Sequence, residues 1–480
     1  MGTVDRIFGV EGIEFHLIPI EGEQDILKHT GFDKLIMYAS ENSIPIFTRY
    51  IDGKEIQIQG VFLPDTHDAY KENFSGLPIF QVQELTIRES ESKPSELTGK
   101  EHYPVDPSDI INANNQFALD FYSNISQNDD KSNVFFSPTS ISTAFSILYE
   151  GAREDTAKEI QNVFGFPENE LECKHGYLSL HNSINEKSNN GTQLQIANAL
   201  WLARNFKPLP EYIDTATTYC DSTVSTVNFA SDDGVNKIND WVKTKTNDKI
   251  KELLKPGSTG PATRMAITNA IYFNGLWQNP FDSEDIYEDD FKINSENTVK
   301  VSMMTYPHKM QINYAATEQM QMLEIPYNDE TFSMLMILPN DLSNLKSVED
   351  SITIENLAIW KEESTGINRG ITIHIPKFTL ESDYNLEKTL PDMGMPSVFS
   401  APDADLSGIT GYKGLFVSQA IHKAFVDVNE VGTEAVGATA INGDESGGTL
   451  FKADHPFIFI IQENETGQIL FMGRVMDPTK

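Results

Sequence analysis

The sequence predicts a multidomain protein in which a small all-β barrel or sandwich is followed by a larger α+β domain. At 480 residues the chain is longer than one ordinary hydrophobic core accommodates. Its first ninety residues are rich in short strand-like runs, and from Asp109 onward helical periodicity begins and long apolar strands follow. We therefore expect an all-β domain over residues 1–90, a linker over 91–108 and an α+β domain over 109–480.

Runs of alternating apolar residues predict the strands of the first domain. They lie close together and are separated by turn sequences such as DGK and SGLP, which is typical of small barrels and sandwiches. The last two runs resemble the final strands of an oligonucleotide/oligosaccharide-binding (OB) barrel, and the alternative is a β module that spaces or anchors the second domain. The runs cover residues 13–20, 33–40, 44–51, 53–63 and 77–87.

The second domain begins after a charged, proline-containing segment without apolar periodicity, which predicts a linker. Apolar residues at helical spacing then predict a helix over 109–126 with Asp109 as its N-cap. Two further helices are expected over 139–152, with Gly151 as its cap, and over 153–165. Long apolar runs predict the strands of at least one large sheet, at residues 193–203, 265–277, 331–339, 369–380, 455–464 and 467–475.

Composition excludes several classes of partner. The formal net charge of −35 repels phosphate backbones and anionic membrane surfaces, so we expect no nucleic-acid partner. No apolar run has membrane length, and the start of the sequence lacks the apolar core of a signal peptide. We expect no membrane span and leave the compartment open, with a preference for the extracellular space or the cell envelope.

The cysteines and histidines predict neither a metal nor another cofactor. Cys173 and Cys220 are far apart and form no CxxC motif, which argues against a zinc module and against a disulfide-stapled scaffold. The ten histidines form no HExxH motif.

The segment GDESGG at residues 443–448 differs by one inserted residue from GDSGG, the surround of the nucleophilic serine in chymotrypsin-like proteases. Catalysis by Ser446 would need a histidine near the front of the domain and a buried aspartate, and no AxHC-like stretch supplies the histidine. Glu445 would also displace the amides that form an oxyanion hole. We expect no enzymatic activity.

Several separated segments of the second domain, in order, resemble the serpin family, the large metastable serine protease inhibitors. They cover residues 133–160, 268–281, 375–390, 404–410, 422–435, 453–461 and 469–478. The resemblance implies about three β-sheets surrounded by eight or nine helices, with an exposed reactive loop. It also implies a monomer that inhibits a target serine or cysteine protease through a covalent acyl complex.

By the same resemblance, the reactive loop follows a hinge made of Glu430, Gly432, Thr433, Glu434 and Ala435. Composition agrees, because no Pro, Lys or Arg occurs between Gly432 and Ser446 and alternate residues are small or β-branched. A strand that enters a sheet tolerates neither proline nor a buried charge. The alternative is a flexible surface loop of similar composition.

The resemblance places the scissile bond at Ser446-Gly447 when residues are counted from the hinge, and at Glu445-Ser446 when they are counted back from HPFIF. No basic residue is near, so a trypsin-like target is not expected. Small or acidic residues at the cut suggest an elastase-like, subtilisin-like or Glu-preferring protease.

The resemblance further implies that certain polar residues lie where the main sheet must part to admit the loop, and that Trp277 lies near the point of entry. The former are Ser137, Ser140, Asn269 and His422. For His422 the alternative is a hydrogen-bonded core histidine. The alternative function is a non-inhibitory serpin that acts as a binding or carrier protein, with the N-terminal domain as an anchoring or ligand-binding module.

Overall fold

The computed structural model has two compact units, Met1–Glu101 and His102–Lys480. It describes residues 107–480 except 188–191, 221, 311, 329, 365–369 and 434–448, and five strands of the first unit. Most of the predicted linker lies outside the described residues. The bounds 1–90, 91–108 and 109–480 stay predictions.

The described strands of the first unit form one sheet in the order β1-β2-β5-β4-β3. They are β1 (Ile7–Val10), β2 (Ile13–Ile18), β3 (Ile46–Ile51), β4 (Lys54–Leu63) and β5 (Ile79–Glu89). β2 and β5 run parallel, and the other neighbours are antiparallel. The run predicted at 33–40 lies outside the described residues. Closure into a barrel, sandwich or OB topology is not supported by these strands and stays a prediction.

The second unit contains ten α-helices among its described residues. They are α2 (Ser108–Asn128), α3 (Pro138–Gly151), α4 (Glu154–Phe164), α5 (Glu170–Lys187), α6 (Pro210–Cys220), α7 (Asp232–Lys245), α8 (Leu345–Ser351), α9 (Ile354–Ser364), α10 (Leu386–Thr389) and α11 (Ser407–Thr410). The resemblance implied eight or nine helices, and the larger number includes α10 and α11, which have four residues each.

Two predicted helix ends are wrong by a residue or two. Pro107 occupies the N-cap position of α2, and Asp109 lies in its first turn. Gly151 is the last helical residue of α3, with Ala152 as the C-cap. The glycine is explained by packing, since a Cβ at Gly151 would collide with the side chain of Ile409.

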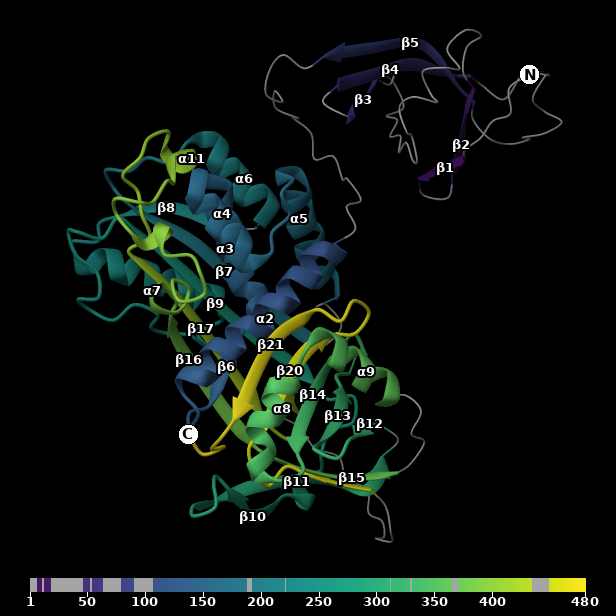
Figure 1. Ribbon diagram of the computed structural model, residues 1–480, viewed down its shortest axis with the longest axis vertical. Coiled ribbons are helices and arrows are strands. Elements are labelled where there is room, and N and C mark those ends of the chain that lie inside the picture. The colour runs from purple at the N-terminus through teal and green to yellow at the C-terminus, as the bar shows by residue number, and fades with distance from the viewer. Residues whose placement is uncertain are drawn as a thin grey trace, which may run out of the picture. The chain divides into compact units, whose positions relative to one another are not determined.

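Three sheets organise the second unit (Figure 1). The main sheet has the order β16-β17-β18-β9-β7-β8, a second has the order β12-β13-β14-β20-β21-β6, and a third has the order β10-β11-β15-β19. The strands are β6 (Val134–Phe136), β7 (Thr192–Ala203), β8 (Thr223–Val227), β9 (Met265–Leu276), β10 (Tyr287–Lys292), β11 (Thr298–Met310), β12 (Asn313–Ala316), β13 (Met320–Pro326), β14 (Phe332–Pro339), β15 (Ile371–Pro376), β16 (Phe378–Asn385), β17 (Gln419–Val428), β18 (Gly432–Thr433), β19 (Thr449–Lys452), β20 (Phe457–Glu463) and β21 (Ile469–Val475).

Helix α3 is the central helix of the hydrophobic core. Nearly all of its residues are buried, including both apolar and hydroxyl side chains. It contacts β9 and β7 of the main sheet and β21 of the second sheet. Its N-terminus is capped by Ser137, whose hydroxyl accepts a hydrogen bond from the Ser140 N–H at 3.2 Å. The Ser137 N–H also donates to Nε2 of His422, which fixes the start of α3 against the middle of the main sheet.

Candidate functional site

The centre of the main sheet is a seam between β17 and β9, which lie side by side in Figure 1. The two strands pair directly and in parallel from Gln419 opposite Ala266 to Phe425 opposite Tyr272. Beyond that point they part, and β18 lies between them. Over the paired length, no space is open for another strand.

The short strand β18 fills the parted end of the seam. Thr433 pairs with Val428 of β17 on one side and with Gly275 of β9 on the other, antiparallel to both. The Thr433 side chain is fully buried, and its hydroxyl lies 2.8 Å from the Tyr327 hydroxyl. A Cβ at Gly432 would collide with the carbonyl oxygen of Gly275, so only glycine fits there.

Trp277 anchors the chain that leads into β18. Its buried ring stacks on Tyr327 with centroids 4.7 Å apart, and its indole N–H donates to the Asn429 carbonyl at 2.9 Å. Its backbone N–H donates to the Val431 carbonyl at 3.0 Å. The structure therefore places Trp277 at the open end of the seam, next to the hinge.

Glu430 is tied to the body of the protein by an ion pair with Lys377, which precedes β16. Its backbone carbonyl accepts a hydrogen bond from the Phe281 N–H at 2.7 Å. Partial burial raises the pKa of Glu430, but the hydrogen bond from Lys377, a backbone hydrogen bond and the charge of Lys377 together outweigh it and hold the pKa below its ordinary value. The carboxylate is therefore ionised at neutral pH and holds the start of the predicted hinge in place.

A buried hydrogen-bonded network lies at the closed part of the seam and joins Ser137, Ser140, Asn269 and His422. All four side chains are fully buried. The Ser137 N–H donates to Nε2 of His422 at 3.1 Å, and its hydroxyl donates to the Leu470 carbonyl at 2.6 Å. The Asn269 amide nitrogen donates to the Ser140 carbonyl at 2.8 Å. The network thus connects the two seam strands to α3 and to the second sheet.

His422 and Asn269 are register partners across the seam, and their side chains are hydrogen-bonded to each other. Because Nε2 of His422 accepts from the Ser137 N–H, its Nδ1 carries the proton and donates to Oδ1 of Asn269. Burial lowers the pKa of His422 to about 3. A second proton on Nε2 would also face the Ser137 N–H donor. The imidazole is therefore neutral. His422 is a hydrogen-bonded core histidine and also lies at the seam, so the two alternatives for this residue do not exclude each other.

We expect the low pKa of His422 to make stability depend on pH. A histidine with an ordinary pKa near 6.5 in the unfolded chain binds a proton there before it does in the fold, so stability is complete above pH 6.5 and falls toward pH 3. Between pH 7.5 and pH 5 the free energy of unfolding should fall by about 2 kcal/mol from this group. Urea unfolding of the wild type and His422→Gln across this range measures it. The variant should lack this part of the decrease in unfolding free energy toward low pH. An equal decrease in both proteins would contradict the low pKa of His422.

Sequence reasoning missed three residues of this region. Asn198 lies opposite Asn269 in the β7–β9 register, and the two amides are hydrogen-bonded. The signal was present, because each asparagine interrupts an apolar strand. Tyr327 and Lys377 carried no such signal, since their partners Thr433 and Glu430 are distant in sequence.

The remaining predicted loop residues lie outside the described part of the chain. They are Glu434, Ala435, Glu445, Ser446 and Gly447. The described ends of this segment are on two different sheets, because Thr433 belongs to the main sheet and Thr449 begins β19, which pairs with β15 in the third sheet.

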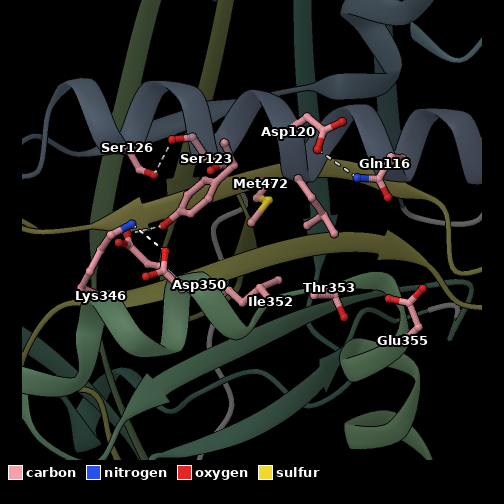
Figure 2. A pocket seen from close by; sticks show the side chains of 13 residues that line it. Gln116, Asp120, Ser123, Ser126, Lys346, Asp350, Ile352, Thr353, Glu355 and Met472 are labelled. Carbon is pink, nitrogen blue, oxygen red and sulfur yellow. Dashed lines mark hydrogen bonds and ion pairs between the residues drawn. The ribbon is translucent and has the colours of Figure 1, made fainter. Parts of the chain in front are cut away.

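A cleft of about 330 Å³ lies between α2 and the α8–α9 segment (Figure 2). Its walls are mostly polar, and Leu119, Ile352 and Met472 are its main apolar side chains. The Tyr122 hydroxyl donates to Glu349 at 2.8 Å, and the buried Arg474 pairs with the same carboxylate at 2.8 Å. Because its walls are mostly polar, the cleft is poorly suited to an apolar ligand.

Among the described residues, no group of three or more His, Cys, Asp or Glu side chains has an arrangement that would hold a metal ion. No described helix combines the length and apolarity that a membrane crossing requires.

Comparison with known proteins agrees with this geometry. The family model described as "Serpin (serine protease inhibitor)" matches residues 112–478. The chain belongs to the serpin family. Serpins are in general protease inhibitors and not catalysts, and the predicted serpin fold of the second domain is confirmed.

Relatives of this serpin differ in the activities that their names record. Leukocyte elastase inhibitor A of Rattus norvegicus is 36% identical over 383 residues, covering 77% of this chain and 99% of the relative. A serpin-like protein of Methanosarcina acetivorans is 38% identical over 380 residues, covering 78% and 87%. The structure of human thyroxine-binding globulin with its hormone has a TM-score of 0.71 and 29% identity, covering 78% of this chain and 100% of that protein. The family therefore includes proteins named as inhibitors and a protein named for binding thyroxine.

Proposed function

We propose that this serpin is a monomeric, single-use, irreversible inhibitor of a serine protease, or of a cysteine protease. The protease nucleophile attacks the carbonyl carbon of Ser446, or of Glu445, and the amine of the next residue leaves, so that an acyl-enzyme links the two proteins. The severed loop then enters the seam between β17 and β9 as a new strand. The protein is consumed and has no turnover of its own.

The observation that supports this proposal best is that β18 already begins the missing strand. Thr433 pairs with both seam strands, and antiparallel pairing can continue from it in one register. Six residues on, Thr439 would face Asn269 of β9 (275 − 6) and His422 of β17 (428 − 6). Both strands give the same register, so insertion needs no slip or bulge.

Insertion would separate the hydrogen-bonded pair that now closes the seam. Since Thr433 points into the core, alternation along a strand points Thr439 inward as well. Its hydroxyl both donates and accepts, so it can satisfy the imidazole and the amide that lose each other. Hydrogen bonds to Thr439 would then replace the hydrogen bond between His422 and Asn269, and neither of these buried side chains would be left unsatisfied.

The target is an elastase-like, subtilisin-like or Glu-preferring protease in this proposal. The loop has small or acidic residues at Glu445, Ser446 and Gly447. Similarity to a protein named leukocyte elastase inhibitor A supports the elastase-like class.

Incubation with a panel of serine and cysteine proteases, followed by denaturing gel electrophoresis, tests the proposal. We expect a covalent band with pancreatic elastase or subtilisin and release of a C-terminal fragment that begins at Gly447 or Ser446. The control is the same protease inactivated beforehand at its serine, which should give no band. Cleavage of the loop by every protease without a covalent band would refute the inhibitory function.

The alternative function, a binding or carrier serpin, draws its support from similarity to thyroxine-binding globulin. The polar cleft between α2 and the α8–α9 segment does not favour it. The role of the N-terminal domain as an anchoring or ligand-binding module, and an extracellular or cell-envelope location, stay predictions.

A further inference from the structure

The third sheet exposes large apolar side chains close to the point where the chain enters it after the reactive loop. Strand β19 begins at Thr449, directly after the loop segment, and pairs in parallel with β15. Leu450 on β19 is 51% exposed, and Tyr287 at the start of β10 is 38% exposed. The other exposed large apolar side chains among the described residues of this unit lie outside its sheets, and they are Leu171, Ile359 and Tyr412.

Side-chain contacts join this region across three strands. The Tyr287 hydroxyl lies 2.8 Å from Nδ1 of His374 on β15, and the two rings meet edge to face. His374 is the register partner of Lys452, whose ammonium group forms an ion pair with Asp289 of β10 at 2.8 Å. Leu450 lies two residues before Lys452 and therefore points to the same side of its strand. We call Tyr287, Asp289, His374, Leu450 and Lys452 the β19 patch.

Strand β19 holds Leu450 in a fixed place within this patch. All four residues of the strand pair with β15. The side chain of Phe451, on the opposite side of the strand, is fully buried. The Ala453 N–H donates to the His374 carbonyl at 2.9 Å, which extends the attachment beyond the strand. Leu450 thus belongs to a preformed surface, and little conformational entropy is lost when a partner contacts it.

The β19 patch is within reach of a protease that attacks the loop at the proposed bond. Leu450 follows Gly447 by three residues, and an extended chain covers at most about 10 Å in that distance. Protease–inhibitor interfaces bury about 800 Å² on each partner and involve roughly 20–30 residues a side. This is more than the few loop residues that occupy the cleft of a protease, so the docked enzyme must also cover the surface beside the loop.

We propose that the β19 patch is a second contact surface for the target protease, with Tyr287 and Leu450 as its apolar contacts. This role rests on the proposed function, because the occupant is the protease that cuts the loop. Tyrosine is enriched at protein interfaces, and apolar contacts bordered by polar groups are typical of their energetically important parts. The ion pair of Lys452 with Asp289 supplies such a polar border here.

The patch should act on docking and not on the fate of the acyl-enzyme. It belongs to the third sheet, whereas the proposed insertion takes place in the main sheet. Contacts with the patch stabilise the complex in which the loop is attacked, so their loss lowers the second-order rate constant of the attack. Insertion and hydrolysis compete only afterwards. A substitution in the patch should therefore slow the attack and leave the ratio of covalent complex to cleaved chain unchanged.

The experiment mixes the full-length protein with pancreatic elastase and follows the loss of intact chain on denaturing gels. Covalent complex and cleaved chain both count as loss, so the rate is measured whether or not the acyl-enzyme is trapped. Tyr287→Ala and Leu450→Ser should each lower the second-order rate constant roughly fivefold, and the double variant roughly 20-fold, because each removes apolar surface that the protease covers. Leu450→Met keeps its apolar surface and should react within about twofold of the wild type.

Leu171→Ser is the matched control, because Leu171 is 46% exposed on α5, at the other end of the second unit from the third sheet in Figure 1. This variant should react at the wild-type rate. Since Leu450 is half exposed, its replacement tests the patch even if Tyr287→Ala fails to fold.

Wild-type rates in both Tyr287→Ala and Leu450→Ser would overturn the proposal, and so would an equal decrease in Leu171→Ser. Failure of the proposed function gives a different result. The wild type is then cleaved without a covalent band, whatever the rates of the patch variants.

Discussion

Replacing Thr433 with arginine is expected to abolish inhibition and to turn the protein into a substrate. Thr433 is fully buried between β17 and β9, with its hydroxyl on Tyr327. No carboxylate is hydrogen-bonded there, so an arginine at this position would bury an unpaired charge, at a cost of about 3–5 kcal/mol. We expect the arginine to leave β18 in the uncleaved variant, so that insertion would have to return it to the sheet, and the same cost would slow insertion by more than about 100-fold.

Such a delay lets water hydrolyse the acyl-enzyme before the loop inserts. Fewer than about one in ten encounters should then end in a covalent complex, whereas we expect the wild type to trap nearly every protease molecule that cuts it. The readout is the number of inhibitor molecules needed per protease molecule, together with the covalent band on a denaturing gel.

Glu434→Arg is the matched control, because it introduces the same side chain one residue later. Alternation along a strand that starts with Thr433 facing inward places residue 434 on the opposite face. Inhibition should persist in this variant. If both variants inhibit like the wild type, residue 433 does not need to stay in the sheet and the insertion mechanism fails.

Local sequence signals predicted the first three helices and the long apolar strands of the serpin domain, which are fewer than half of its helices and strands, and they did not predict the state of the seam. Apolar runs at 265–277 and 455–464 correspond to β9 and β20, because a strand buried on both faces is apolar throughout. Whether β9 pairs with β17 or with the reactive loop depends on a competition between long-range pairings, and one sequence is compatible with both. The direct β17–β9 pairing is therefore information that only the structure provides.

The candidate site was predictable where a family motif marked it. Ser137, Ser140, Asn269 and His422 were expected at the seam, and the structure brings all four into one network. Their partner Leu470 contributes only a backbone carbonyl, which no residue type encodes.

Cleaving the loop once is expected to raise the melting temperature by roughly 10–20 °C. Continuation of the register from Thr433 to Asn442 would place nine more residues in the main sheet, with Asn442 opposite Ala266. New ladder bonds and the cost of ordering the loop are of similar size. The net gain comes from burying the inward-facing side chains of these residues fully and the outward-facing ones in part, on the order of 10 kcal/mol at ~25 cal/mol per Å². For a domain of this size, a gain in stability of this magnitude raises the melting temperature by roughly 10–20 °C.

Calorimetry before and after limited digestion measures this shift, with the cut site checked by sequencing the released fragment. The same cut in Thr433→Arg is the control, because its buried charge should keep the severed loop out of the sheet and leave the melting temperature nearly unchanged. A large rise in both proteins would show that cleavage stabilises by some route other than insertion. No rise in either would mean that the seam stays closed after cleavage, and the protein would then belong with the non-inhibitory members of its family.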